Sequence, residues 1–217
     1  MKASDHALIV IKAGLNAVPV VGGSIASLIG DYVPLSTQRS IERATELLSQ
    51  RIGSLEGRID TDTINKDEFS ELFKSCYLIV VRTTHETKLR AAAAILANIL
   101  LKQGDQDRLS YTELDHFVRC LDGLSIGAIT VLGAVENIIV RGKISPDSDG
   151  HQTIPFESLS EDLKTLEPSL LLGLVAESNA FNLLHLHGRP DIPTARYGNY
   201  PISLTPLGKR FVRSFLE

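Results

Sequence analysis

Apolar residues dominate the first part of the chain, between Leu8 and Val33, where glycine and proline interrupt them. The stretch from Ala7 to Val18 predicts a first helix. Pro19 interrupts that helix, because proline lacks a backbone N–H and clashes with the preceding turn. The stretch from Ser24 to Tyr32 predicts a short second helix. The pattern therefore predicts an apolar helical hairpin at the start of the chain.

The second helix of this hairpin has a smooth face, on which Gly22, Ala26 and Gly30 recur every four residues, as in helices that approach closely in membranes. As one continuous helix, the segment would be roughly 39 Å long, enough to cross a bilayer. Lys12 and Asp31 disfavour a permanent span, because buried charges need partners. A transmembrane helix, a hairpin that moves from protein to membrane, and an ordinary pair of packed helices remain open. The candidate membrane or interaction residues are Ile9, Ile11, Leu15, Val18, Val20, Val21, Gly22, Gly23, Ile25, Ala26, Leu28, Ile29 and Gly30.

From Ser36 or Thr37 onward, apolar residues recur alternately every three and four positions, which indicates a heptad seam on a helix with a charged outer face. Such a seam pairs with a helix of the same chain or of a second copy. An intramolecular bundle is favoured, because the seam covers fewer than three heptads. The candidate oligomer or bundle seam consists of Ile41, Leu48, Ile52, Leu55 and Ile59.

Capping patterns mark two further helices. Asn65-x-x-Glu68 predicts a helix from Lys66 to Arg82, and Thr83-x-x-Glu86 predicts another from Glu86 to Lys102 that is built on an alanine run. A polar break from Gln103 to Arg108 follows. We therefore expect two domains, at residues 1–104 and 105–217.

The second domain is expected to hold four helices and a β-hairpin. Three helices are expected at residues 110–121, 126–140 and 157–172, the last of them ended by Gly173 in the left-handed conformation. Strands are expected at 181–187 and 200–204, and Thr205-Pro206 is expected to open the last helix. The fold class predicted is mainly α.

Composition narrows the setting. The chain has 217 residues, of which 43% are hydrophobic and 22% charged, so it can bury a core. Its net charge of −4 supplies no general attraction for nucleic acid. Cys76 and Cys120 lie in apolar helical patterns and are expected to be buried thiols, which favours a reducing cytoplasm. Asp5, His6 and Lys12 interrupt the pattern that a signal peptide requires.

Two phrases near the C-terminus point to known families. A helix containing LLLGLV, a hairpin and then YPISLTPLGKRFV are typical of a winged helix, in which the Leu-Thr-x-x-Gly phrase (here Leu204, Thr205 and Gly208) closes the wing. Residues 77–217 also resemble the abortive-infection alpha family of bacterial phage-defence proteins, through KLRAAAAILANILLK, LDHFVRCLDGLSIGAITVL, LLLGLV and the LTPLG ending. The resemblance implies a phage-defence setting and brings no active site with it.

A winged helix reads DNA by laying its third helix in the major groove. The third helix expected here, at residues 157–172, has a net charge of −3, from four carboxylates against Lys164, and it would face a polyanion. Basic residues occur instead in the wing loop and on the last helix. The candidate phosphate contacts are Arg189, Arg196, Lys209, Arg210 and Arg213. Without a basic third helix, no sequence-specific nucleic acid is expected as a partner.

Other chemistry is sparse. His185 and His187 alternate on an expected strand, so both imidazoles would face one side and form half of a metal site. His116, His151 and Asp191 are equally open as further ligands. The sequence contains no nucleophile elbow, phosphate loop or metalloprotease spacing. We therefore expect no catalytic residue, metal, cofactor or small-molecule substrate.

These patterns lead to three hypotheses. In the first, the chain is a cytoplasmic anti-phage protein and not an enzyme. Its N-terminal hairpin acts on or attaches to the inner membrane, and its winged helix binds protein, in a homo-oligomer or with a partner. In the second, it is an adaptor or oligomerisation module without membrane contact. In the third, it is a winged-helix transcriptional regulator.

Overall fold

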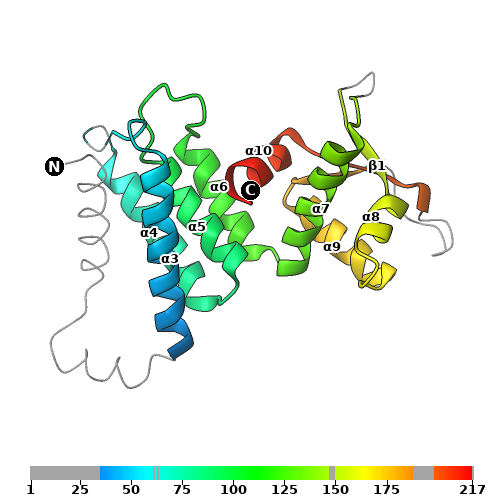
Figure 1. Cartoon of the computed structure of the whole chain (residues 1–217), viewed down its shortest axis with the longest axis horizontal. Coiled ribbons are helices and arrows are strands. Elements are labelled where there is room, and N and C mark those ends of the chain that lie inside the picture. Colours follow the sequence, from blue (N-terminus) through cyan, green and yellow to red (C-terminus); the bar gives the residue numbers. More distant parts are fainter. Residues whose placement is uncertain (1–34, 61, 63, 147–149, 188–197, 217) are drawn as a thin grey trace. The chain divides into compact units, whose positions relative to one another are not determined.

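The computed structural model describes residues 35–216, apart from 61, 63, 147–149 and 188–197. Eight helices and three short strands make up this part of the chain, which confirms the mainly α fold class (Figure 1). The chain divides into two compact units, Met1–Asp122 and Gly123–Glu217, called unit 1 and unit 2 below. The N-terminal hairpin predicted between Leu8 and Val33 lies outside the described residues.

Unit 1 is a bundle built around one alanine-rich helix. Its helices are α3 (Leu35–Ser54), α4 (Lys66–Arg82), α5 (Glu86–Asn98) and α6 (Tyr111–Gly123), which ends at the boundary with unit 2. Helix α5 packs against both α3 and α4, and every residue from Ala91 to Asn98 is buried. Because alanine side chains are small, the neighbouring helices approach α5 closely, as the alanine run predicted.

The capping patterns of unit 1 are only partly as predicted. The side chain of Asn65 accepts hydrogen bonds from the first turn of α4, which spans the predicted residues. The expected capping box of α5 is wrong, because the hydroxyl of Thr83 accepts from His85 N instead (3.1 Å) and Glu86 is paired with Arg43. Helix α5 also ends at Asn98 and not at Lys102, since the chain turns there to pair with an earlier segment.

The predicted seam, from Ile41 to Ile59, continues beyond the end of its helix. Helix α3 stops at Ser54, so Leu55 and Ile59 lie in a turn and in a bridge between Ile59 and Leu101. Gly57 allows this turn through its positive φ of 85°. Both apolar side chains are nevertheless buried in unit 1, because the turn carries them back to the core.

The boundary between the units lies after Asp122, whereas the sequence placed the domain boundary at residue 104. The polar break of residues 103–108 is not a linker. Ion pairs and hydrogen bonds attach this loop to the turn after α3 and to Asn98 at the end of α5. Helix α6, which follows the loop, belongs to unit 1.

Unit 2 surrounds a small antiparallel sheet with four helices. Its elements, in order, are α7 (Ile126–Gly142), β1 (Thr153–Pro155), α8 (Phe156–Asp162), α9 (Pro168–Ala180), β2 (Leu184–Leu186), β3 (Pro201–Leu204) and α10 (Pro206–Phe215). The strand order is β1-β3-β2, with Ile154 opposite Ile202 and Leu184 opposite Leu204. These four side chains are buried, and the sheet contacts α7, α9 and α10. Strand β1 was not expected, because three residues are too few to show a period.

The helix predicted at residues 157–172 is wrong. Two helices, α8 and α9, occupy this region, and Gly173 lies inside α9 instead of ending a helix. Pro168 is the cause, since it lacks an N–H and keeps the preceding Glu167 extended (φ −67°, ψ 137°). The Glu167 side chain then accepts a hydrogen bond from Leu170 N and caps α9. The first expected strand is shorter than predicted, because a turn that contains Asn182 at a positive φ of 57° follows α9 and delays the strand to Leu184.

The Leu-Thr-x-x-Gly phrase forms the corner between β3 and α10. Thr205 Oγ1 accepts from Gly208 N (2.9 Å) and donates to Asn182 O (2.6 Å), so it caps α10 and holds it to the turn before β2. Gly208 meets the carbonyl of Leu183 so closely that an added Cβ would lie 1.9 Å from the oxygen. Thr205 thus opens the last helix as predicted, and the glycine is required by a backbone contact.

We expect Gly208→Ala and Gly173→Ala to change stability in opposite directions. At Gly208 the new methyl group overlaps a backbone carbonyl, so α10 must move, and we expect a loss of about 1–3 kcal/mol. At Gly173, inside α9, an added Cβ meets nothing within 4 Å, so the helix should gain about 0.5–1 kcal/mol. Urea unfolding of the two full-length variants measures both changes. Equal effects would contradict the corner's close contact.

Candidate functional site

An apolar groove in unit 1 lies among α3, α4 and α5. It has a volume of about 410 Å³, which includes open solvent. The half-buried residues Ile41, Ala44, Thr45 and Tyr77 form its rim. Its buried lining consists of Leu48, Phe73, Cys76, Val80, Ala92, Ala93 and Leu96. The small alanines of α5 leave the space that forms the groove.

The groove presents almost no polar atoms. Thr45 Oγ1 donates to Ile41 O within its own helix (2.8 Å), so it needs no further partner. Burial raises the pKa of the Cys76 thiol to about 12, so this sulfur stays protonated and uncharged at neutral pH. Phe73 and Tyr77 stack along one wall. Such a surface suits an apolar side chain, not a charged ligand.

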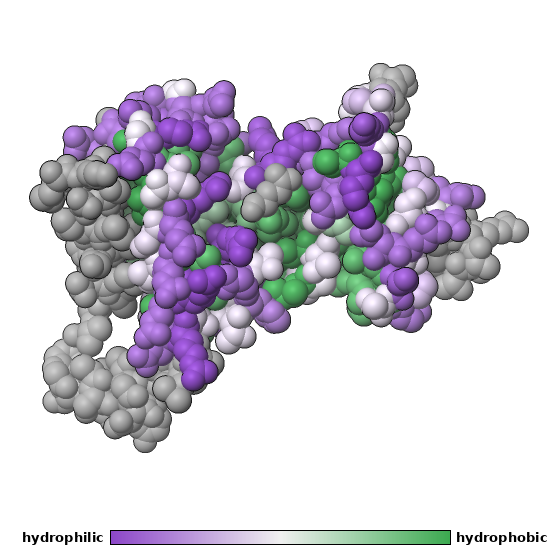
Figure 2. All heavy atoms as spheres, viewed as in Figure 1, coloured by the Kyte–Doolittle hydropathy of each residue, from purple (hydrophilic) through white to green (hydrophobic). Residues whose placement is uncertain are grey.

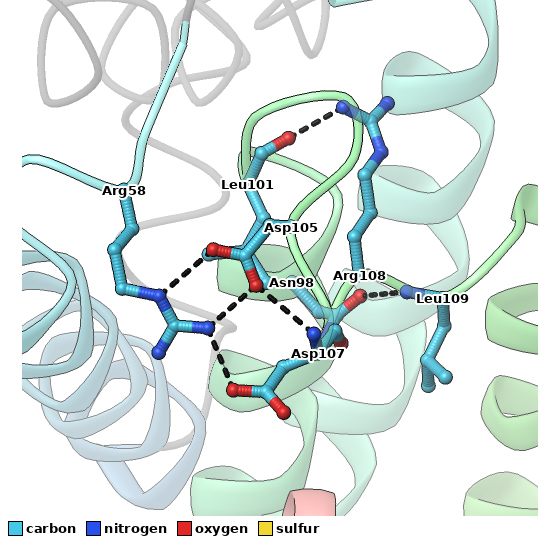
Figure 3. A network of polar contacts seen from close by, with 7 residues as sticks. All are labelled: Arg58, Asn98, Leu101, Asp105, Asp107, Arg108 and Leu109. Carbon is cyan, nitrogen blue, oxygen red and sulfur yellow. Dashed lines mark hydrogen bonds and ion pairs between the residues drawn. The ribbon is translucent and has the colours of Figure 1, made fainter.

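An ion-pair network joins the turn after α3 to the loop after α5 (Figure 3). The guanidinium of Arg58 donates to both carboxylate oxygens of Asp105 (2.8 and 2.6 Å) and to Asp107 (2.6 Å). The backbone of the same segment continues the contact, with Lys102 N donating to Arg58 O (2.8 Å). Arg58 lowers the pKa of Asp105 to about 2, so the carboxylate stays ionised at neutral pH.

Asn98 fixes the loop after α5 from within the core. Its amide nitrogen donates to Asp107 O (2.8 Å), and its amide oxygen accepts from Leu109 N (2.9 Å). Arg108 donates to Leu101 O in the same loop (2.5 Å; Figure 3). Both polar groups of a buried side chain are therefore satisfied, as burial demands.

A second group of contacts joins the first half of α3 to the start of α5 and the residues just before it. Arg43 donates to both oxygens of Glu86, at 2.6 Å in the shortest contact, and to Glu46 (3.0 Å). Ser40 Oγ donates to Thr83 O (2.7 Å). These contacts hold the first half of α3, and the turn after this helix, against α5 and its flanking loops. The part of α3 that forms a wall of the groove therefore has a fixed position.

The predicted seam residues lie at this wall or behind it. Ile41 is half-buried on the rim, and Leu48, Ile52, Leu55 and Ile59 are buried in unit 1. The outer face of α3 is instead hydrophilic (Figure 2). The seam therefore takes part in the intramolecular bundle that its short length favoured. The groove itself was not predicted, because the alanine run indicates close approach and not space.

The candidate phosphate contacts that the structure describes are already engaged in other interactions. Arg189 and Arg196 lie outside the described residues. Arg213 Nε donates to Glu136 Oε1 (2.8 Å), a carboxylate whose residue is only 2% exposed, and Lys209 donates to Gln152 (2.8 Å). Arg210 also has an interaction partner. Lys209 and Arg213 of α10 thus make contacts within unit 2.

Helix α9 presents an uncharged face. Glu177 is its only charged residue, and the Ser125 hydroxyl donates to that carboxylate (2.8 Å). Leu170 is 52% exposed, and the small residues Ser169, Gly173 and Ala176 are exposed near it. The acidic residues expected on the third helix lie on α8 and its flanks, because Pro168 divides the region.

Three imidazoles gather beside the sheet of unit 2. His185 and His187 meet edge to face, with ring centroids 4.4 Å apart, and His151 lies 5.4 Å from His187. His187 Nε2 and Ser203 Oγ form a hydrogen bond (2.9 Å). In the described part of the chain, no group of three or more His, Cys, Asp or Glu has an arrangement that could hold a metal ion. Of the further ligands left open, His151 lies near the pair, and Asp191 lies outside the described residues.

No described helix is by itself long and apolar enough to cross a bilayer. Helices α6 and α7 reach the length and apolar composition of a membrane span only when they are taken together as a bent pair. Burial explains the apolar content of α7, since Val131, Leu132 and Val135 are fully buried.

We expect Asn98→Ala to lower the stability of the chain by about 1–3 kcal/mol, because it leaves buried backbone groups without partners. Gln103→Ala, an exposed position in the same loop, should change stability by less than about 0.5 kcal/mol. Urea unfolding of both variants provides the comparison. Similar curves would mean that Asn98 does not hold the loop.

We also expect both cysteines to be inert in the folded protein. Burial raises the pKa of each thiol to about 12, including Cys120, whose sulfur lies 3.4 Å from His116 Nε2. A soluble maleimide at pH 8 should therefore label neither residue until denaturant is added. Rapid labelling of Cys120 alone would instead indicate an activated Cys–His pair and reopen the case for an enzyme.

The described residues thus offer an apolar groove in unit 1 and an uncharged helix face in unit 2, both suited to binding apolar or protein surfaces. Comparisons of the chain with protein-family models, curated proteins and solved structures find no match.

Proposed function

We propose that the protein is a non-enzymatic anti-phage protein of the abortive-infection type. Its apolar segment between Leu8 and Val33 attaches to or acts on the inner membrane, and unit 2 is a winged-helix-like module that binds protein. The phage-defence setting rests on the resemblance described above. The uncharged outer face of α9 is the observation that carries the binding preference of unit 2.

The element order of unit 2 supports the winged-helix part of the proposal. One helix, a short strand, two helices and an antiparallel hairpin follow one another, and β3 lies between β1 and β2. Helix α9 is then the third helix, which reads DNA in winged-helix regulators. Here it has no Lys or Arg and exposes Leu170. A helix without Lys or Arg cannot neutralise phosphates, so protein binding is favoured over DNA binding.

The distribution of apolar residues supports the membrane part. Most large apolar side chains of the described helices are buried, and the exposed exceptions, Leu78, Val140 and Leu170, are scattered singly along the chain. The sequence from Leu8 to Val33 is apolar over a longer stretch than the described helices, interrupted only by glycine, proline and a few polar residues. Apolar segments of this kind bind the boundary between lipid headgroups and acyl chains.

Vesicle binding tests the membrane part. We expect the full chain to float with phosphatidylethanolamine–phosphatidylglycerol vesicles and to release an entrapped dye. A variant without residues 1–34 should do neither. In the full chain, Leu28→Asp should reduce flotation, because a charge in the apolar face opposes insertion.

The matched control is Gln50→Asp, which introduces the same charge on the exposed face of α3 and should float as the unchanged protein does. If the deletion variant floats and releases dye as well as the full chain, the membrane role is wrong. The adaptor hypothesis without membrane contact would then replace it.

A further inference from the structure

The groove in unit 1 runs along one face of α3. On α3 its lining residues are Ile41, Ala44, Thr45 and Leu48, the spacing of one helix face. This stripe is roughly 10 Å long at 1.5 Å per residue. Across from it, Ala92 and Ala93 of α5 leave room for side chains larger than their own. A short apolar helix with a bulky face would fill this space.

The chain itself supplies such a helix at the required place. The sequence predicts a helix from Ser24 to Tyr32, roughly 13 Å long, which ends just before Pro34. Helix α3 begins at Leu35. Because so few residues separate the two helices, the predicted one must either turn back along α3 or project away from the bundle. Turning back brings it alongside the stripe that starts at Ile41.

The two surfaces are chemically complementary. The bulky face of the predicted helix consists of Ile25, Leu28, Ile29 and Tyr32. The groove offers apolar walls, a protonated thiol and a threonine already bonded within its own helix. The ion pairs of Arg43 with Glu86 and of Arg58 with Asp105 hold the walls of the groove in position before any segment binds. Covalent attachment also gives the segment a high effective concentration at the groove.

We propose that the groove among α3, α4 and α5 is the docking site of residues 24–32, which are held there when no membrane is present. The release of this segment is then the step that exposes the membrane-active part, and this consequence rests on the proposed function. Docking itself does not depend on it. A covered groove and a covered segment explain together how so apolar a stretch is carried in water.

A single indole reports the docking, because the chain contains no tryptophan. In full-length Tyr32→Trp, measured without vesicles, we expect blue-shifted emission and weak quenching by acrylamide. Adding Ala44→Glu places a charge on the groove rim and should red-shift the emission and raise the quenching constant several-fold. Adding Gln50→Glu, on the exposed face of the same helix, should leave both unchanged.

Folding is checked in each variant by far-UV circular dichroism and urea unfolding. If Ala44→Glu unfolds the protein, a pair of cysteines replaces it. Leu28→Cys with Thr45→Cys should be joined by a short bismaleimide within one chain, and Leu28→Cys with Gln50→Cys should not. The native thiols are buried and do not compete.

Several outcomes would overturn the docking. An indole that is fully quenched in the protein with an intact groove shows an uncovered segment. Emission that is unaffected by Ala44→Glu shows burial elsewhere. Burial that grows with protein concentration assigns the groove to a second copy of the chain. Vesicle leakage bears only on the proposed function, since a docked segment that never leaks vesicles would leave the groove assignment intact.

Discussion

The burial of α5 on all sides is the constraint on which unit 1 depends. Eight consecutive residues, from Ala91 to Asn98, have almost no contact with solvent. A helix so enclosed must be small in cross-section if α3 and α4 are to reach it, and alanine meets that need. The same smallness has a second effect. Beside Ala92 and Ala93, the described side chains of α3 and α4 leave an apolar groove.

Two ion pairs, Arg43 with Glu86 and Arg58 with Asp105, help to hold the helices of unit 1 around α5. Arg43, Glu86 and Arg58 are each about 40% exposed, whereas the Asp105 side chain is only 11% exposed. Exposed ion pairs contribute little stability singly. Their geometry matters more, because each is bidentate and joins segments more than forty residues apart in the sequence. They position α3, and the turn after it, relative to α5 and the loop that follows α5. Burial of the apolar seam residues supplies most of the free energy that holds these helices together.

Local chemistry made much of the fold predictable. Asn65 and Thr205 cap helices where the sequence placed them, because capping depends on residues within one turn. Long-range competition defeated the same logic elsewhere: Glu86 is bound by Arg43, so it cannot close a box with Thr83. Of the site, the seam was predictable from its period. The groove was not, because space left by small residues appears only once three helices are assembled.

The groove and the segment before it suggest why the docked state can be reversible. A fully buried bulky side chain contributes about 1.5–3 kcal/mol, and ordering a residue's backbone costs about 1–2 kcal/mol. For a short helix with one apolar face these terms are of similar size, so attachment to α3 decides whether the helix docks. A bilayer can surround the whole apolar surface of the segment, whereas an open groove covers one face. The preference for the groove is therefore limited to conditions without a membrane, which is the behaviour that a stored membrane-active segment requires.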